Sequence, residues 1–157
     1  MTGQRPRTVL ALAGVGIVGL GLTARFGLPR LGASWDFVAD LAGSVLYTAM
    51  WFVLLRFVFL ALSARAATAW AVGISVGIEL LQLTGLPALA VSAFAPLRLL
   101  LGTTFAVLDL VGYALGGLVA LGVAKALERR GSRPRSAAGR ARRRAQESGS
   151  QPSGPSQ

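Results

Sequence analysis

The chain contains no cysteine and no histidine among its 157 residues. Without cysteine, a disulfide framework and thiol chemistry are excluded. Without histidine, the commonest metal ligand and the usual general base are missing. We therefore expect no metal and no cofactor.

Charge is scarce through most of the sequence. Only nine ionisable side chains lie between Thr8 and Lys125, whereas 54% of the whole chain is hydrophobic and its mean hydropathy is +0.61. Four long apolar runs separate these charges, which indicates an integral membrane protein rather than an unusually apolar soluble bundle. The predicted fold class is all-α, with four transmembrane helices forming one domain over residues 9–125.

The four predicted spans cover residues 9–23, 40–62, 67–86 and 97–124. The first resembles a secretory signal, but Leu22 occupies a position where cleavage needs a small residue, so we expect an uncleaved helix. The apolar stretch from Pro87 to Pro96 is too short to cross a membrane. Its two prolines argue against a continuous helix, so we interpret it as an interfacial or shallow re-entrant connection.

The distribution of arginine and lysine predicts the orientation of the chain. Four spans place both termini on one side, and the larger share of basic residues on that side favours the cytoplasm, with residues 1–8 as a short cytoplasmic N-terminus. Residues 126–157 are rich in Gly, Ser, Pro and Arg and are predicted to be a disordered tail. Nine of the sixteen basic residues lie from Lys125 onward. We expect this tail to contact anionic lipids; nucleic acid is the disfavoured alternative, because no aromatic residues alternate with the arginines.

Polar residues interrupt the third and fourth spans in regular patterns. At about 100° per residue, Thr68, Ser75, Glu79 and Gln82 share one face of the third helix. In the fourth, small and polar residues recur at spacings of three and four, and the glycines are typical of close helix packing. These residues are Gly102, Phe105, Asp109, Gly112, Tyr113 and Gly116.

We expect these two helices to form an antiparallel hairpin with Glu79 and Asp109 close together, each within about 5 Å of the membrane midplane. The hydroxyl of Tyr113, four residues after Asp109, could reach its carboxyl group. Two adjacent carboxylates in a medium of low dielectric repel each other, so at least one should carry a proton unless a cation intervenes. Arg56 is the candidate cation; alternatively its head group extends to the membrane surface.

The segment from Gly14 to Gly19 matches the pattern G-x-G-x-x-G. A dinucleotide site needs this pattern between a strand and a helix, but here it lies inside an apolar span. We interpret these glycines as a smooth surface that lets another helix approach.

Three blocks resemble the small bacterial membrane proteins of domain-of-unknown-function family 2809. They are Gly-Leu-Thr-Ala-Arg at 21–25, Ile-Glu-Leu-Leu-Gln-Leu at 78–83, and Leu-Gly-Thr-Thr-Phe at 101–105 followed by Asp-Leu-Val-Gly-Tyr at 109–113. The chain departs from the family's Gly-Asp-x-Leu-Trp pattern, since it has Ser44 and Tyr47 in place of the acid and the tryptophan. Asp40, one turn earlier, is a candidate substitute for that acid.

The family resemblance implies a fold and a set of shared residues, without an activity. We expect a multi-pass location in the plasma membrane of a bacterial cell. A more distant resemblance is to VanZ-like membrane proteins, which also have an intramembrane Glu-x-x-Gln and a later Asp. That group is associated with glycopeptide resistance in the cell envelope.

Three functions follow as hypotheses. The leading one is a non-enzymatic protein of the cell envelope in which Glu79, Gln82 and Asp109, with Ser75, Tyr113 and Arg56, form a polar core or binding site. The second is a proton- or ion-coupled carrier that uses Glu79 and Asp109 as a relay; with only four helices it would need to form a homo-oligomer. The third is an intramembrane enzyme that uses the same two acids for general acid-base catalysis.

Overall fold

The computed structural model describes the backbone of residues 4–101 and 106–149, and the side chains of residues 7–98, 100–101 and 106–130. The described residues form helices and turns without any strand. The four longest helices are α1 (Gln4–Gly27), α2 (Asp36–Val58), α3 (Ala64–Gln82) and α6 (Val107–Gly149). All four contain a stretch long and apolar enough to cross a membrane. The prediction of a four-helix, all-α membrane protein is confirmed.

Short elements connect these helices. The 3₁₀ turns η1 (Leu28–Leu31) and η2 (Ala33–Trp35) lead from α1 into α2. Between α3 and α6 lie α4 (Leu86–Ala93), η3 (Ala95–Leu97) and α5 (Arg98–Leu101). Gly85, just before α4, has φ +74°, a conformation that residues with a Cβ adopt rarely.

The connection between the two prolines contains more helix than the sequence predicted. Pro87 lies in the first turn of α4, where a missing backbone N–H costs nothing. The helix ends at Ala93, Phe94 is extended, and Pro96 lies in the first turn of η3. One proline therefore starts a short helix and the other follows its end.

The predicted fourth span, residues 97–124, is wrong at its start. α5 ends at Leu101 and α6 begins at Val107, so that the chain is not helical at Ala106. Hydropathy alone does not predict this interruption, because one continuous apolar helix and two apolar helices in series have the same hydropathy. Gly102 and Phe105, both part of the predicted packing pattern, lie outside the described residues.

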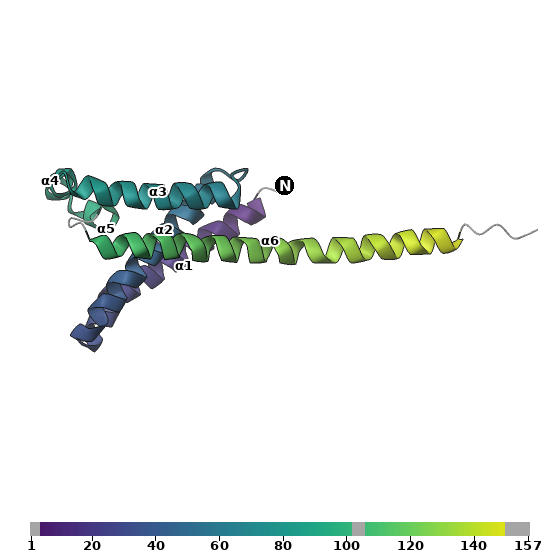
Figure 1. Cartoon of the computed structure of the whole chain (residues 1–157), viewed down its shortest axis with the longest axis horizontal. Helices are drawn as coiled ribbons and strands as arrows, with labels where there is room; N and C mark the ends of the chain where they lie inside the picture. The colour runs from purple at the N-terminus through teal and green to yellow at the C-terminus, as the bar shows by residue number, and fades with distance from the viewer. Residues whose placement is uncertain (1–3, 102–105, 150–157) are drawn as a thin grey trace, which may run out of the picture. The chain divides into compact units, whose positions relative to one another are not determined.

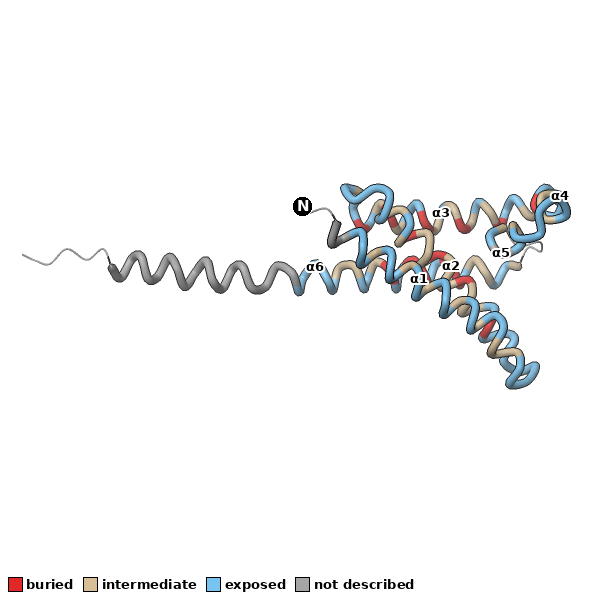
Figure 2. Tube along the Cα trace, turned by 180° about the vertical axis from the view of Figure 1, so that it is seen from behind, coloured by how far each residue is buried: buried red, intermediate tan, exposed pale blue. Residues whose placement is uncertain are grey.

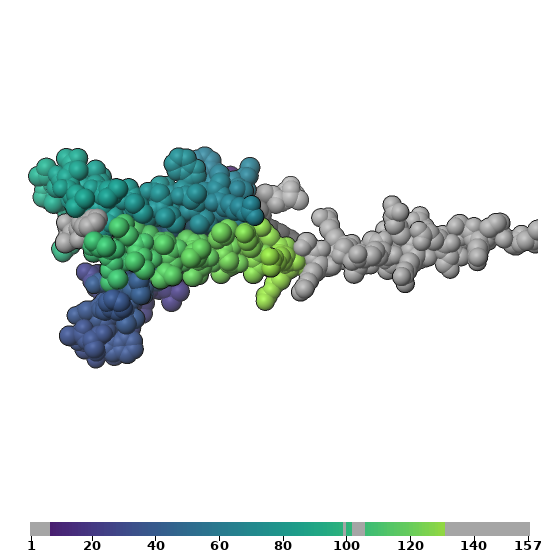
Figure 3. Space-filling model, in the orientation of Figure 1, coloured from purple at the N-terminus to yellow at the C-terminus, as the bar shows by residue number. Residues whose placement is uncertain are grey.

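Helix α2 occupies the centre of the packing within residues 1–122. It runs beside α1 on one side and crosses α3 and the first turns of α6 on the other (Figure 1). α3 and α6 are antiparallel neighbours: the start of α6 contacts the end of α3 at Glu79, and Gly117 lies against Thr68 and Val72 nearer the start of α3. The space-filling view shows α3 in contact with the first part of α6 (Figure 3).

Burial is concentrated on the facing sides of α2, α3 and α6. On α3 the buried residues recur every three or four positions, from Ala64 through Ala67, Ala71 and Ser75 to Glu79. By contrast, the membrane-spanning stretch of α1 contains no buried residue, and its residues are exposed or half-buried along its length (Figure 2). In a bilayer, lipid covers such a surface.

Residues 123–157 form a second unit, described here by itself. α6 continues through its basic sequence as far as Gly149. The prediction of disorder from residue 126 is therefore not confirmed for residues 126–149, and residues 150–157 lie outside the described part of the chain.

Candidate functional site

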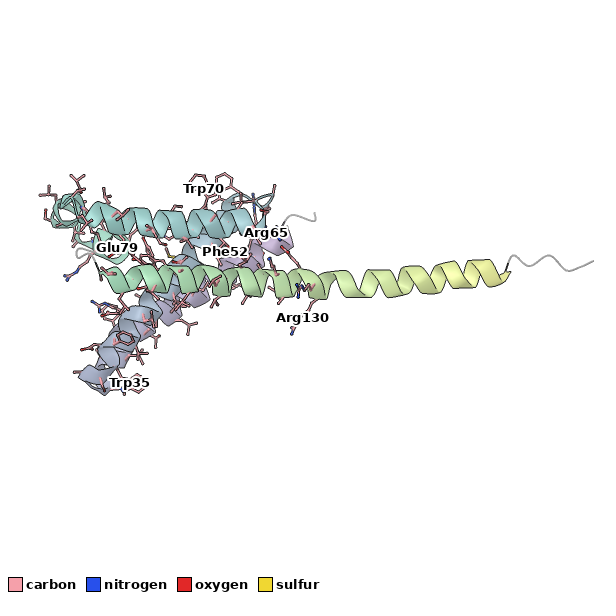
Figure 4. All side chains as sticks on the ribbon, in the orientation of Figure 1. Trp35, Phe52, Arg65, Trp70, Glu79 and Arg130 are labelled. Atoms are coloured by element: carbon pink, nitrogen blue, oxygen red, sulfur yellow. The ribbon has the colours of Figure 1, made fainter. Side chains whose placement is uncertain are left out.

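The carboxyl group of Glu79 lies in the last turn of α3 and points toward α6 (Figure 4). Glu79 is only 1% exposed. Its Oε2 accepts a hydrogen bond from the Tyr113 hydroxyl at 2.8 Å, and its Oε1 accepts one from the backbone N–H of Ala106 at 2.5 Å. Both oxygens of this buried acid are therefore occupied by donors of the same chain.

The bond from Ala106 explains why an acid stands at position 79. Ala106 immediately precedes α6, and the first N–H groups of a helix have no acceptor within the helix. Away from water these groups need another acceptor. A carboxylate is well suited, because the helix dipole places partial positive charge at this end. Glu79 thus acts as a cap for α6, supplied by a neighbouring helix.

The other end of the same connection is held by side chains of α2 and α3. The Tyr47 hydroxyl donates to the carbonyl oxygen of Leu100 at 2.6 Å, and Gln82 Nε2 donates to that of Leu101 at 2.7 Å. These carbonyls belong to the last residues of α5, which lack partners within their helix. We call Tyr47, Glu79, Gln82 and Tyr113 the connection cluster. The first three bind backbone atoms at the two ends of the α5–α6 connection, and Tyr113 binds Glu79.

Asp109 faces a different neighbour. Its Oδ1 lies 2.5 Å from Oγ of Ser44 on α2. Tyr113, which the sequence suggested as a partner of Asp109, donates to Glu79 instead. Within the described residues, the two acids share no hydrogen bond: Glu79 binds across the α3–α6 contact and Asp109 across the α2–α6 contact.

Neither acid lies at the middle of its helical span, and the location of both near the membrane midplane stays a prediction. Glu79 lies six residues, or about 9 Å, from the middle of the α3 span Ala64–Gln82. Asp109 is the third residue of α6, about 14 Å from the middle of the span Val107–Arg130. The spans differ from those expected because α3 ends at Gln82 rather than at residue 86, and α6 begins at Val107 rather than at residue 97. Because α3 and α6 are antiparallel, both acids lie toward the same end of this helix pair.

Two other predicted site residues lie apart from the connection cluster. Ser75 is fully buried, and its Oγ accepts a hydrogen bond from Thr48 of α2 at 3.2 Å. Arg56 donates from Nη1 to the carbonyl oxygen of Leu62, just before α3 begins. Glu79 lies fifteen residues after Ala64, the first residue of α3, which is about 22 Å along the helix axis. Arg56 therefore does not lie between the two acids.

The glycines of α6 lie where its backbone approaches its neighbours. A Cβ added to Gly112 would fall under 3.0 Å from Ser44, and one added to Gly116 would meet the backbone of Val45 at a similar separation. Gly117, which the sequence pattern did not single out, has the same relation to Val72 of α3. The two glycine contacts with α2 and the one with α3 let α6 fit between both helices.

Two residues that the structure places at this site were named from the sequence only as departures from the family pattern. These are Ser44 and Tyr47, which lie on the face of α2 that also contains Asp40. Asp40 itself is exposed and pairs with Arg25 of α1 at 3.4 Å, so it does not take the place of an acid in the site. The role of the Ala106 backbone could not be found from sequence, because any residue supplies an N–H.

The cluster offers mainly hydrogen-bond acceptors and hydroxyl groups. The described residues contain no group of three or more acidic, histidine or cysteine side chains that could hold a metal ion. Gln82 Oε1 is buried and has no hydrogen-bond partner within the described part of the chain. The arrangement can therefore fix backbone ends and accept one further hydrogen bond, from a donor that approaches Gln82.

Comparison with protein families gives one match. Residues 33–117 match the family described as protein of unknown function (DUF2809). The match covers more than half of the chain and includes all four residues of the connection cluster, and the chain belongs to this family. Searches of the curated proteins and of the solved structures give no match.

Proposed function

We propose that this member of the family is a non-enzymatic, multi-pass protein of the bacterial cell envelope. In this proposal the connection cluster fixes the α5–α6 connection near the outer face of the plasma membrane. The observation that carries the proposal is the state of Glu79. It is 1% exposed, and both its carboxyl oxygens accept hydrogen bonds from the chain itself. An acid held in this way serves the packing of the helices.

The location of the acids also favours this function over transport. Carriers generally bind their substrate and coupling ion near the bilayer midplane. Glu79 and Asp109 lie in terminal turns of their spans and hydrogen-bond to different helices. A relay between them would have to break these bonds at every step. The cluster instead resembles a fixed anchor for a break in the helical structure.

The proposed orientation rests on the basic residues. Arg7 near the start of α1, Arg65 at the start of α3, and the basic residues from Lys125 onward lie at the ends of their spans opposite to Glu79. An excess of arginine and lysine marks the cytoplasmic side. Both termini would then be cytoplasmic, and the connection cluster would face the cell exterior. The basic tail would bind anionic lipids of the inner leaflet, at about 1 kcal/mol for each residue near the surface.

A proton-coupled carrier is the second candidate, favoured by the short contact between Ser44 and Asp109. A hydroxyl next to a carboxyl group could pass a proton between them. In this alternative Asp109 is the essential group, and Glu79 supports the structure around it.

The test is a flux measurement on the full chain in lipid vesicles, made with wild type, Glu79→Gln and Asp109→Asn. An imposed pH gradient should collapse no faster in wild-type vesicles than in vesicles without protein, and Glu79→Gln should unfold at a lower temperature. Proton flux through wild type that Asp109→Asn abolishes, without loss of the fold, would overturn the proposal in favour of the carrier. Turnover of a lipid-linked substrate by wild type would overturn it in favour of an enzyme.

A further inference from the structure

The hydroxyl of Ser44 lies between two oxygen atoms. Its Oγ is 2.9 Å from the backbone carbonyl oxygen of Asp40, one turn earlier on α2, and 2.5 Å from Asp109 Oδ1 on α6. Both separations are hydrogen-bond distances. Ser44 is 6% exposed, so water has little access to the contact.

A serine hydroxyl has one hydrogen and can donate it only once. The Asp40 carbonyl oxygen can only accept. If the Ser44 hydrogen goes to Asp40, the remaining short contact needs a hydrogen from Asp109. If Asp109 is ionised, the hydrogen goes to its carboxylate instead, and two oxygen lone pairs face each other at 2.9 Å. Only a protonated Asp109 satisfies both contacts together.

The groups around Glu79 favour an ionised carboxylate, whereas those around Asp109 favour a neutral acid. A phenolic O–H and a backbone N–H both point their hydrogens at its carboxyl oxygens. A backbone N–H cannot act as an acceptor. The Tyr113 hydroxyl is already used as a donor to Oε2, so a proton on Glu79 would displace one of these two bonds.

We propose that the two acids are held in opposite states: Asp109 is a neutral carboxylic acid that donates its hydrogen to Ser44, and Glu79 is an ionised carboxylate. Ser44 then donates to Asp40, and a chain of two hydrogen bonds links α6 to the backbone of α2. Asp109 is thus a positioning residue for the contact between these helices. The proposal does not depend on the proposed function, since it concerns the location of a hydrogen and holds whether or not the chain conducts protons.

The remaining charged and titratable groups near this contact have other partners. The Asp40 carboxylate pairs with Arg25 of α1 at 3.4 Å, and the Tyr47 hydroxyl donates to Leu100. The Tyr113 hydroxyl donates to Glu79 of α3. None of these side chains hydrogen-bonds to Asp109 within the described residues, which leaves Ser44 as the group that its hydrogen can reach.

Infrared spectroscopy of the full chain in lipid vesicles at neutral pH tests the proposal, because neutral and ionised carboxyl groups absorb at different frequencies. The chain has three aspartates, Asp36, Asp40 and Asp109, so ¹³C labelling of the aspartate carboxyl groups allows them to be counted. One of the three should absorb as a neutral acid. Asp109→Asn should remove that band, whereas Asp40→Asn, the matched control, should leave it in place. In Ser44→Ala the band should shift, since the acid loses its acceptor.

The labelled wild type alone decides the question if a variant does not fold. Three ionised aspartates would overturn the proposal, as would a neutral-acid band that Ser44→Ala leaves unshifted. With ¹³C-labelled glutamate, Glu79→Gln should remove intensity from the carboxylate band only. Loss of a neutral-acid band in that variant would contradict the assignment of Glu79.

Discussion

Helices α1 and α6 place their glycines in different surroundings. In α1, a Cβ added to Gly14 would meet Val53 of α2 at an ordinary contact distance of 3.7 Å, and one added to Gly16, Gly19 or Gly21 would meet no atom within 4 Å. The glycines of α6 at 112, 116 and 117 have no such room, and a buried acid and a buried tyrosine are hydrogen-bonded beside them. Similar small-residue patterns in the sequence therefore correspond to a surface with room for added side chains in α1 and to a close backbone contact in α6.

The difference teaches that glycine spacing alone does not identify a contact in a membrane protein. In α6 the glycines occur together with Asp109 and Tyr113, whose polar groups need partners that lipid cannot supply. In α1 the neighbours of the glycines are apolar, and lipid can cover them equally well. A polar residue among the glycines is the additional feature that indicates a helix contact.

The largest effect should come from adding one methyl group to α6. Gly116→Ala would place a Cβ under 3.0 Å from the backbone of Val45, which cannot rotate away. We expect a loss of about 1–3 kcal/mol in the free energy of unfolding, measured by denaturant titration in mixed micelles. Gly16→Ala is the control: with open space around it, the variant should be unchanged or up to about 1 kcal/mol more stable. Equal effects at both positions would remove the distinction between the two helices.

The next effect compares the two acids as amides. Glu79→Gln replaces an acceptor oxygen with an NH₂ group that faces the donors of Tyr113 or Ala106. An unsatisfied buried donor costs about 1–3 kcal/mol, so the melting temperature should fall clearly. Asp109→Asn should cost less, since an amide can either accept a hydrogen bond from Ser44 or donate one to it. Thermal unfolding of both variants in the same detergent measures the difference, and a larger loss for Asp109→Asn would reverse the comparison.

A smaller effect is expected from removing a single hydroxyl. Tyr113→Phe keeps the buried ring, which is 6% exposed, and deletes only the donor to Glu79. A hydrogen bond between membrane helices contributes about 0.6 kcal/mol on average. The free energy of unfolding of the variant should therefore fall by about 0.6–1 kcal/mol. In the double variant with Glu79→Gln the two losses should not add, because both remove the same bond. Full additivity would show that the two residues act independently.

The smallest effect should be at the ion pair between α1 and α2. The side chains of Arg25 and Asp40 are 62% and 58% exposed. Exposed pairs contribute little, commonly under about 1 kcal/mol. Asp40→Asn should therefore leave the unfolding free energy within about 0.5 kcal/mol of wild type. A loss as large as that of Glu79→Gln would show that α1 is held by charge rather than by apolar contact.

Composition and periodicity were sufficient for the fold class, the four spans and the polar face of α3. The hydrocarbon environment imposes length and apolarity directly on the sequence. Composition and periodicity were not sufficient to predict the start of α6 or the hydrogen-bond partners of Glu79 and Asp109. Those depend on the non-helical backbone at Ala106, and no residue type near this position forces a break. The partner of Glu79 is a backbone N–H, which no sequence pattern can distinguish.

The central claim is that Glu79 caps α6 from a neighbouring helix. Amide hydrogen exchange of the full chain in lipid vesicles tests it most directly. In Glu79→Gln the Ala106 amide should exchange about tenfold faster or more, as a loss of about 1.4 kcal/mol implies, while the amides of α1 keep their wild-type rates. Unchanged exchange at Ala106 in a folded Glu79→Gln variant would contradict the account.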